Sequence, residues 1–125
     1  GSSKITETIF ENRMNHVDLL NQMGSSITLK DNIAYINGVK KLRGMTLVGL
    51  DLRSSAALII AALTSKSVSY VYGLEHLDRG YENFEQKLSK LGIEIKRQIT
   101  KRTSSASNYE NSTSSNKEVS EIKAA

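Results

Sequence analysis

Apolar and polar positions alternate along this chain with two different periods, which predict short strands and short helices in turn. Strands are expected where apolar residues alternate with polar ones between turn residues. These segments are 26–30, 33–38, 45–50, 67–72 and 93–99. Helices are expected where apolar residues recur every three or four positions, as they do over 16–23, 53–65 and 81–91. The mixture predicts an α/β (α+β) fold.

Two predicted helices each end at a glycine, Gly24 and Gly92. Glycine is common there because it adopts the left-handed backbone of a helix C-cap without steric cost. Aligning these glycines, an offset of 68 positions, also aligns four further identical pairs. They are Glu7 with Glu75, Asn15 with Asn83, Leu20 with Leu88 and Ile27 with Ile95. A repeated strand, turn, helix, glycine and strand would explain this pattern, although two helices that end alike share part of it.

The predicted helix at 53–65 contains an unbroken apolar run from Ala56 to Leu63. A helix that is apolar on all sides must be enclosed by other elements, so this one is expected in the core. The run is far shorter than the ~20 residues that span a membrane, and no signal-peptide pattern is visible. We therefore expect a cytoplasmic protein with no membrane partner.

The charge distribution bears on a nucleic-acid partner. The net charge is +4, but residues 96–125 hold six Lys and Arg against three Asp and Glu, which leaves the rest nearly neutral. A nucleic-acid-binding domain usually carries a basic stripe. The single short basic cluster, Lys40, Lys41 and Arg43, is interpreted as a solvated turn. We expect no nucleic-acid partner.

Metal and cofactor chemistry has little support in the composition. The chain has no cysteine, and its two histidines, His16 and His76, are sixty positions apart. Metal sites need clustered ligands. We therefore predict no metal site and no cofactor, and we interpret both histidines as structural.

The two ends of the chain differ from its centre. Over 103–116, eleven of fourteen residues are Ser, Thr or Asn, a composition that cannot bury enough apolar surface to order the chain. We predict a disordered C-terminal tail over 101–125. The chain opens with Gly-Ser-Ser rather than methionine, so Gly1–Ser3 suggests either a fragment or a tag remnant.

Three arginines, Arg13, Arg53 and Arg79, lie at or near points where a loop or strand is expected to enter a helix. The first turn of a helix has unpaired N–H groups and the positive end of the dipole, so an arginine beside it favours phosphate or carboxylate binding. Three such positions in one short chain suggest one anionic ligand.

The segments that carry these arginines form a recognisable series: TETIFENR at 6–13, DLRSSAALIIA at 51–61 and HLDRGYENFEQKL at 76–88. In this order they resemble the C-terminal part of the UDP-N-acetylglucosamine enolpyruvyl transferases, also called UDP-N-acetylglucosamine 1-carboxyvinyltransferases, over about Lys4 to Arg97. The related 5-enolpyruvylshikimate-3-phosphate synthases usually have a His-Arg pair in place of Asp-Leu-Arg and lack HLDRGYEN. The resemblance is therefore closer to the amino-sugar enzymes.

The resemblance implies an architecture. Residues 1–100 would be the C-terminal part of an enolpyruvyl transferase domain, an inside-out α/β barrel of βαβαββ units with helices inside and sheets outside. Part of such a domain should leave apolar surface uncovered. Family members usually end soon after the last strand, so the Ser/Thr/Asn-rich stretch is a departure with no assigned role.

The resemblance also implies roles for five residues. Arg79 would close over phosphoenolpyruvate, while Asp51 and Arg53 would face the reaction centre. Arg13 would face the enolpyruvyl pocket, and the backbone at Ile9 would contact the nucleotide sugar. The predicted catalytic residues are thus Asp51, Arg53 and Arg79, and the predicted substrate-binding residues are Ile9, Arg13, Arg53 and Arg79.

Each residue also has a purely structural interpretation. Arg79 could form a surface ion pair with Asp78, and Arg13 could pair with Glu11. Asp51 suits the N-cap of the helix that follows it. The Ile9 side chain by itself indicates only a core position.

The implied reaction transfers the enolpyruvyl group of phosphoenolpyruvate to the 3-hydroxyl of UDP-N-acetylglucosamine, with release of phosphate. The expected partners are these two small molecules and the missing N-terminal part of the same enzyme. Because the family's acid and base residues lie outside this sequence, the isolated chain should be inactive. Two alternatives stay open, namely a 5-enolpyruvylshikimate-3-phosphate synthase-like transferase and a non-catalytic interaction module.

Overall fold

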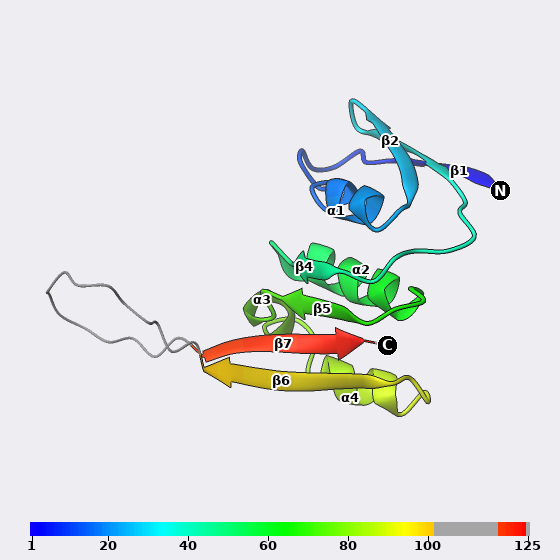
Figure 1. Ribbon diagram of the computed structural model, residues 1–125. Coiled ribbons are helices and arrows are strands. Elements are labelled where there is room, and N and C mark those ends of the chain that lie inside the picture. The colour runs from blue at the N-terminus through cyan, green and yellow to red at the C-terminus, as the bar shows by residue number, and fades with distance from the viewer. Residues whose placement is uncertain (102–117, 125) are drawn as a thin grey trace, which may run out of the picture.

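Two β-sheets and the helices packed against them make up residues 1–101 and 118–124, the part of the chain that the computed structural model describes (Figure 1). The first sheet has the order β1 (Ser2–Thr6), β3 (Ile33–Asn37), β2 (Ser26–Lys30), and both of its strand pairs are antiparallel. Helix α1 (Val17–Gln22) follows β1 in the chain and packs on β2. The predicted helix at 16–23 and the strands at 26–30 and 33–38 are confirmed.

The second sheet is built from the remaining strands. Its order is β4 (Thr46–Val48), β5 (Ser69–Tyr72), β7 (Glu118–Ala124), β6 (Ile95–Lys101), in which β4 runs parallel to β5 and the other pairs are antiparallel. Helix α2 (Leu52–Leu63) connects the two parallel strands, as a crossover between parallel strands requires. Two short helices, α3 (Glu75–Asp78) and α4 (Phe84–Ser89), separate β5 from β6. Helix α4 is shorter than the predicted 81–91, and α3 was not predicted.

The two sheets share a topology, which confirms the internal repeat. In the first sheet, β3 is last in the chain and pairs between β1 and β2; in the second sheet, β7 is last and pairs between β5 and β6. The series β1, α1, β2, β3 thus matches β5, α4, β6, β7. With β4 and α2 in front, the second series is a complete βαβαββ unit, as the fold prediction requires.

The first and last described strands correct two predictions. Ser2 and Ser3 lie in β1, paired with β3, and were not expected in a strand. Residues 118–124 form β7, paired on both sides, and Lys101 lies in β6, so the prediction of a disordered tail is wrong for these residues. Both strands depend on backbone pairing with neighbours distant in the chain, which local composition does not reveal. The rest of the predicted tail, 102–117 and 125, lies outside the described residues.

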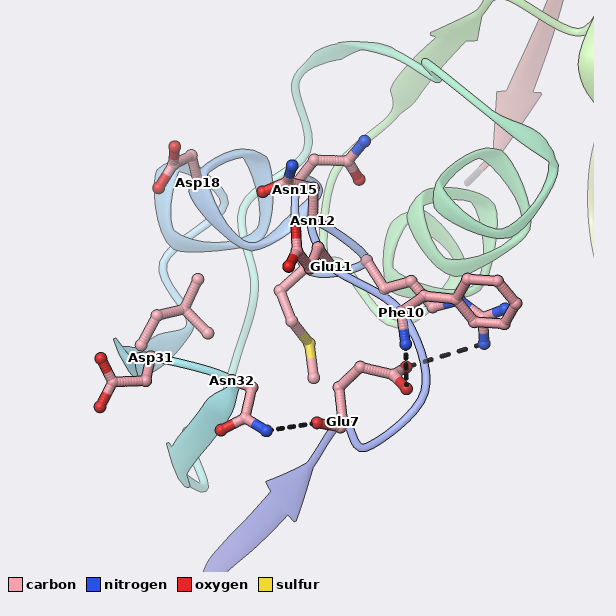
Figure 2. A pocket seen from close by; sticks show the side chains of 11 residues that line it. Glu7, Phe10, Glu11, Asn12, Asn15, Asp18, Asp31 and Asn32 are labelled. Carbon is pink, nitrogen blue, oxygen red and sulfur yellow. Dashed lines mark hydrogen bonds and ion pairs between the residues drawn. The ribbon is translucent and has the colours of Figure 1, made fainter.

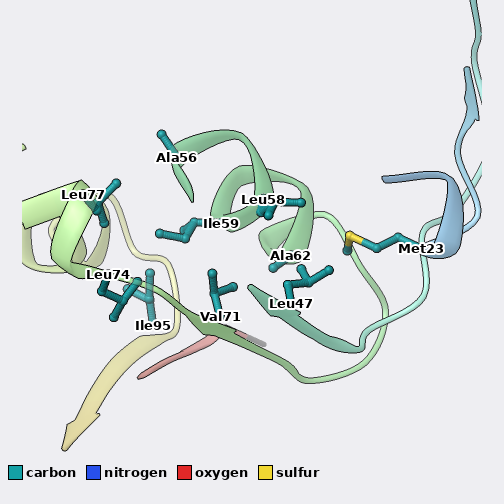
Figure 3. Packing of buried hydrophobic residues seen from close by; sticks show 10 residues of the cluster. All are labelled: Met23, Leu47, Ala56, Leu58, Ile59, Ala62, Val71, Leu74, Leu77 and Ile95. Atoms are coloured by element: carbon teal, nitrogen blue, oxygen red, sulfur yellow. The ribbon is translucent and has the colours of Figure 1, made fainter. Parts of the chain in front are cut away.

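The hydrophobic core lies between α2 and the second sheet (Figure 3). The fully buried side chains of Leu58 and Ile59 on α2 face the core that Leu47 of β4 and Val71 of β5 complete. Met23, at the C-terminal end of α1, extends this core toward the first sheet. Burying each such side chain stabilises the fold by about 1.5–3 kcal/mol. The predicted core position of this helix is confirmed, although Ile60 on its other side is 55% exposed.

Candidate functional site

The candidate site begins at the first turn of α2, which Asp51 caps. One carboxylate oxygen of Asp51 accepts the backbone N–H groups of Arg53 and Ser54, both at 2.9 Å. The hydroxyl of Ser54 in turn accepts the backbone N–H of Asp51 at 2.9 Å, which completes a capping box. The N-cap interpretation of Asp51 is confirmed. The cap fixes the turn that carries Arg53.

Asp51 also joins this turn to the segment that follows β1. The amide nitrogen of Asn15 donates to the second carboxylate oxygen of Asp51 at 3.2 Å. The backbone N–H of Ser54, together with the Asn15 and Arg53 bonds, holds the pKa of Asp51 below its usual range. Asp51 is thus an anion whose oxygens are already occupied by donors from two segments.

His16 lies beside this contact. Burial lowers the pKa of His16, and the nearby Asp51 carboxylate offsets part of that effect. Its Nδ1 atom is buried and has no hydrogen-bond partner among the described residues. His16 is therefore partly buried near the Asp51 carboxylate, consistent with a structural residue.

The third segment reaches the same turn through Gly80. A Cβ atom on Gly80 would lie 2.6 Å from both terminal carbons of Leu52, the first residue of α2. The absence of a side chain therefore lets the turn after α3 pack directly on the start of α2. Arg79 precedes this contact, and Arg53 follows Leu52. The motif segments at 51–61 and 76–88 thus meet at one helix N-terminus, and Asn15, two residues after the motif at 6–13, contacts the same turn.

Arg53 and Arg79 are both exposed. Neither guanidinium group has a hydrogen bond or ion pair with another described residue, so both charges remain open to a ligand. Arg79 does not enter a helix as predicted; it follows α3 as its C-cap. The alternative ion pair with Asp78 is also wrong, because Asp78 binds Arg97 of β6 at 2.7 and 2.9 Å.

Arg13 lies at a pocket of about 470 Å³ formed by the segment after β1 and the turn between β2 and β3 (Figure 2). Its guanidinium is 3.7 Å from the Glu7 carboxylate and 3.8 Å from the centre of the Phe10 ring. The predicted partner, Glu11, is not the one observed. Glu7 and Phe10 thus fix the orientation of the Arg13 side chain. They also partly neutralise its charge, which is then less available to a ligand.

Glu7 organises the wall of this pocket. Its carboxylate accepts the backbone N–H groups of Ile9 at 2.8 Å and Phe10 at 3.3 Å, and the bond from Ile9 is the main cause of its lowered pKa. Its backbone exchanges two hydrogen bonds with Asn32: the N–H donates to the Asn32 carbonyl at 2.9 Å, and the Glu7 carbonyl accepts from the Asn32 amide at 2.5 Å (Figure 2). The segment is therefore anchored to the β2–β3 turn.

The Ile9 side chain is 75% exposed, so the core interpretation of this side chain is wrong. A contact between Ile9 and a ligand stays a prediction. The structure adds Glu7, Asn15 and His16, which sequence reasoning did not place at the site. The repeat alignment, which contains Glu7 and Asn15 among its identities, was an available signal for these two residues, and Glu7 also lies in the motif at 6–13.

Within residues 1–101 and 118–124, no three acidic, histidine or cysteine side chains group as a metal site would need. No helix in this part of the chain has the length and apolar character needed to cross a membrane.

Comparison with known proteins settles the family. Residues 1–88 match the family model of EPSP synthase (3-phosphoshikimate 1-carboxyvinyltransferase). The chain belongs to this family. Within it, the relatives named UDP-N-acetylglucosamine 1-carboxyvinyltransferase are those that the sequence motifs indicated, which confirms the predicted resemblance.

One such relative, from Prochlorococcus marinus subsp. pastoris, is 87% identical over 125 residues, which is 100% of this chain and 27% of the relative. This alignment includes Gly1–Ser3. A relative of the same name from Synechocystis sp. is 53% identical over 97 residues, covering 78% of this chain and 22% of the relative. The chain thus spans about a quarter of the length of these relatives.

A solved structure supports the fold assignment. The enolpyruvyl transferase NikO from Streptomyces tendae aligns with a TM-score of 0.67 and 30% sequence identity, over 74% of this chain and 22% of that one. The enolpyruvyl transferase fold predicted from the sequence is confirmed.

Proposed function

We propose that the full-length protein carrying this chain transfers the enolpyruvyl group of phosphoenolpyruvate to the 3-hydroxyl of UDP-N-acetylglucosamine and releases phosphate. The observation that carries the proposal is the meeting of the second and third motif segments at the start of α2, together with Asn15, which lies two residues after the first motif segment. Asn15 bonds Asp51 there, Gly80 packs on Leu52, and the adjacent arginines are open to an anion. Relatives over the whole or most of this chain carry the name of this activity.

The substrates suit these cations. Phosphoenolpyruvate carries a phosphate and a carboxylate, and a guanidinium can hold two oxygens of either group at once. Arg79 and Arg53 are proposed to bind this substrate. Arg13, beside the first pocket, is proposed to face the enolpyruvyl group, and the backbone near Ile9 to contact the nucleotide sugar.

The reaction proceeds by addition and then elimination. The sugar hydroxyl gives its proton to a base as its oxygen bonds to the central carbon of phosphoenolpyruvate, and the methylene carbon takes up a proton from an acid. The resulting tetrahedral intermediate then loses phosphate and a methyl proton, which restores the carbon–carbon double bond. Such chemistry needs a base, an acid and cations that stabilise the anionic intermediate.

This chain supplies the cations and the capped turn that positions Arg53. Asp51 is proposed to face the reaction centre from this turn. The remaining acid and base are proposed to come from the rest of the protein, which also explains why the isolated chain should be inactive. The activity would be the first committed step of peptidoglycan precursor synthesis, in the cytoplasm, and would support cell shape and division.

Phosphate release by the purified full-length protein tests this proposal. With phosphoenolpyruvate and UDP-N-acetylglucosamine, release should accompany formation of the enolpyruvyl sugar. With shikimate 3-phosphate as the acceptor, no release is expected. Turnover with shikimate 3-phosphate alone would replace this proposal with the 5-enolpyruvylshikimate-3-phosphate synthase reaction, and no turnover with either acceptor would favour the interaction module.

A further inference from the structure

Arg97 on β6 connects two short helices that the chain itself separates by a turn. Its two terminal nitrogens donate to both carboxylate oxygens of Asp78, at 2.9 and 2.7 Å, and one of them also donates to Glu85 at 3.1 Å. Asp78 is the last residue of α3, and Glu85 lies in the first turn of α4. One side chain thus holds both ends of the turn at 79–83.

This turn carries Arg79, and its other side faces the site. Gly80 packs against Leu52 at the start of α2, as described above. On the Arg97 side, the turn borders a pocket of about 310 Å³ that Arg97 also lines. The turn is therefore fixed between α2 and Arg97. A change on the Arg97 side should alter where Arg79 lies.

Arg97 also pairs with carboxylates that could otherwise pair with Arg79. Asp78 is adjacent to Arg79 in the sequence, yet both of its oxygens are bonded to Arg97. The side chain of Glu85 is 15% exposed and is paired with the same guanidinium. These bonds raise the pKa of Arg97, with the bond to Asp78 as the main cause. Without Arg97, the carboxylate of Asp78, which is adjacent to Arg79 in the sequence, and that of Glu85 would both lose their partner.

We propose that Arg97 is a positioning residue: it anchors the turn at 79–83 and engages Asp78 and Glu85, so that Arg79 is placed and left unpaired for an anionic ligand. The assignment rests on the proposed function only for the identity of that ligand, phosphoenolpyruvate. The anchoring itself follows from contacts among described residues.

The test compares Arg97→Gln with Lys96→Gln in the full-length protein. Lys96 precedes Arg97 on the same strand, is exposed and carries the same charge, so its variant controls for strand and net charge. Arg97→Gln should raise amide hydrogen exchange over 79–83 by about ten-fold and raise the KM for phosphoenolpyruvate by about ten-fold. The KM for UDP-N-acetylglucosamine should change by less than about two-fold. Lys96→Gln should change none of these values.

A second variant, Arg97→Lys, keeps the charge and loses the two-point contact, and should give intermediate values. It also keeps the test valid if Arg97→Gln fails to fold. Unchanged exchange over 79–83 in both variants would overturn the anchoring, whatever the kinetics. A fall in kcat with both KM values unchanged would overturn the positioning role. A third outcome separates the two proposals. If Arg97→Gln raises exchange over 79–83 but the wild-type protein has no transfer activity, the anchoring stands and the proposed function is overturned.

Discussion

The three arginines of the site differ in their surroundings. Arg13 is paired with Glu7 and lies over the Phe10 ring, whereas Arg53 and Arg79 are exposed and have no ion pair with other described residues. A cation that already has a carboxylate partner has less charge to offer a ligand. Arg53 and Arg79 should therefore dominate phosphate and carboxylate binding, and Arg13 should mainly shape its pocket.

Arg79→Lys in the full-length enzyme tests the two-point contact with phosphoenolpyruvate. Lysine keeps the charge but not the planar fork, and a charge-assisted hydrogen bond contributes ~1.5–3 kcal/mol. Catalytic efficiency for phosphoenolpyruvate should fall roughly ten- to a hundred-fold, with folding unchanged. Arg43→Lys, an exposed arginine whose guanidinium lies beside Gly24, is the matched control. Equal kinetics for Arg79→Lys and wild type would remove Arg79 from the site.

Asp51 has two separable roles, the cap and the charge. Asp51→Ala should lose both, with a stability loss of about 1 kcal/mol from the cap. Asp51→Asn keeps one acceptor oxygen for the cap but loses the bond from Asn15, so it should lose less stability than Asp51→Ala, and it should lose activity if the charge matters. Thermal unfolding and steady-state kinetics measure the two effects. If Asp51→Asn is as active as wild type, Asp51 is only a cap.

His16 should make the stability of the folded protein depend on pH. Burial depresses its folded pKa below the ordinary value of 6.5, so the unfolded chain binds a proton first as the pH falls. Stability should therefore be constant above about pH 6.5 and decline below it, by at most about 1.4 kcal/mol per pH unit. Urea unfolding of wild type and His16→Gln from pH 8 to 5 checks this, since the variant should lack the decline that His16 causes. The same slope in both proteins would assign the decline to other groups.

At the scale of elements, the sequence predicted those defined by local pattern. The helix at 53–65 was predictable because its apolar run needs enclosure, and α1 because Gly24 ends it. Strands β1 and β7 were not predictable, because their five or seven residues gain stability from pairing with distant strands.

The ion-pair partner of Arg13 was also not predicted. Asn12 has a left-handed φ of 59° and the chain turns there, so the guanidinium meets Glu7 and not Glu11.

The site segments could be predicted from their motifs, but their contacts could not. Arginine positions and their order are visible in the sequence. That Asp78 would bind Arg97, on a strand nineteen positions further along, depends on how β6 packs beside α3 and α4. Such a contact has no local signature.

The close packing at the junction between β5 and α3 depends on the missing side chain of Gly73. A comparison with Gly92 measures how much this packing contributes to stability. Both glycines have positive φ, 76° and 84°, so an alanine at either should cost about 1–2 kcal/mol in backbone strain. At Gly73 a Cβ would also lie 2.3 Å from the backbone oxygen of Gly49, whereas at Gly92 it would meet nothing within 4 Å. Gly73→Ala should therefore lower stability by about 1–3 kcal/mol more than Gly92→Ala in denaturant unfolding. Equal losses of stability in the two variants would mean that the backbone at Gly73 can move away from Gly49 at no cost.

At the scale of the molecule, the chain combines one complete βαβαββ unit with a βαββ series that precedes it. Apolar side chains lie uncovered on several parts of this surface, among them Leu50 at 58% and Leu91 at 76% exposure. The resemblance implied such uncovered surface for part of a larger domain. The proposed active site is likewise only part of a larger one. The described residues supply cations at one helix N-terminus, and the proton donor is expected elsewhere in the full-length protein.

The most direct measurement is a crystal structure of the full-length protein with phosphoenolpyruvate and UDP-N-acetylglucosamine bound. The account predicts phosphoenolpyruvate beside the first turn of α2, with the guanidinium groups of Arg53 and Arg79 within hydrogen-bond distance of its phosphate or carboxylate oxygens. Arg97 should still hold Asp78 in that complex. If phosphoenolpyruvate binds away from α2, or if Arg53 and Arg79 point to separate surfaces without touching it, the central claim is contradicted.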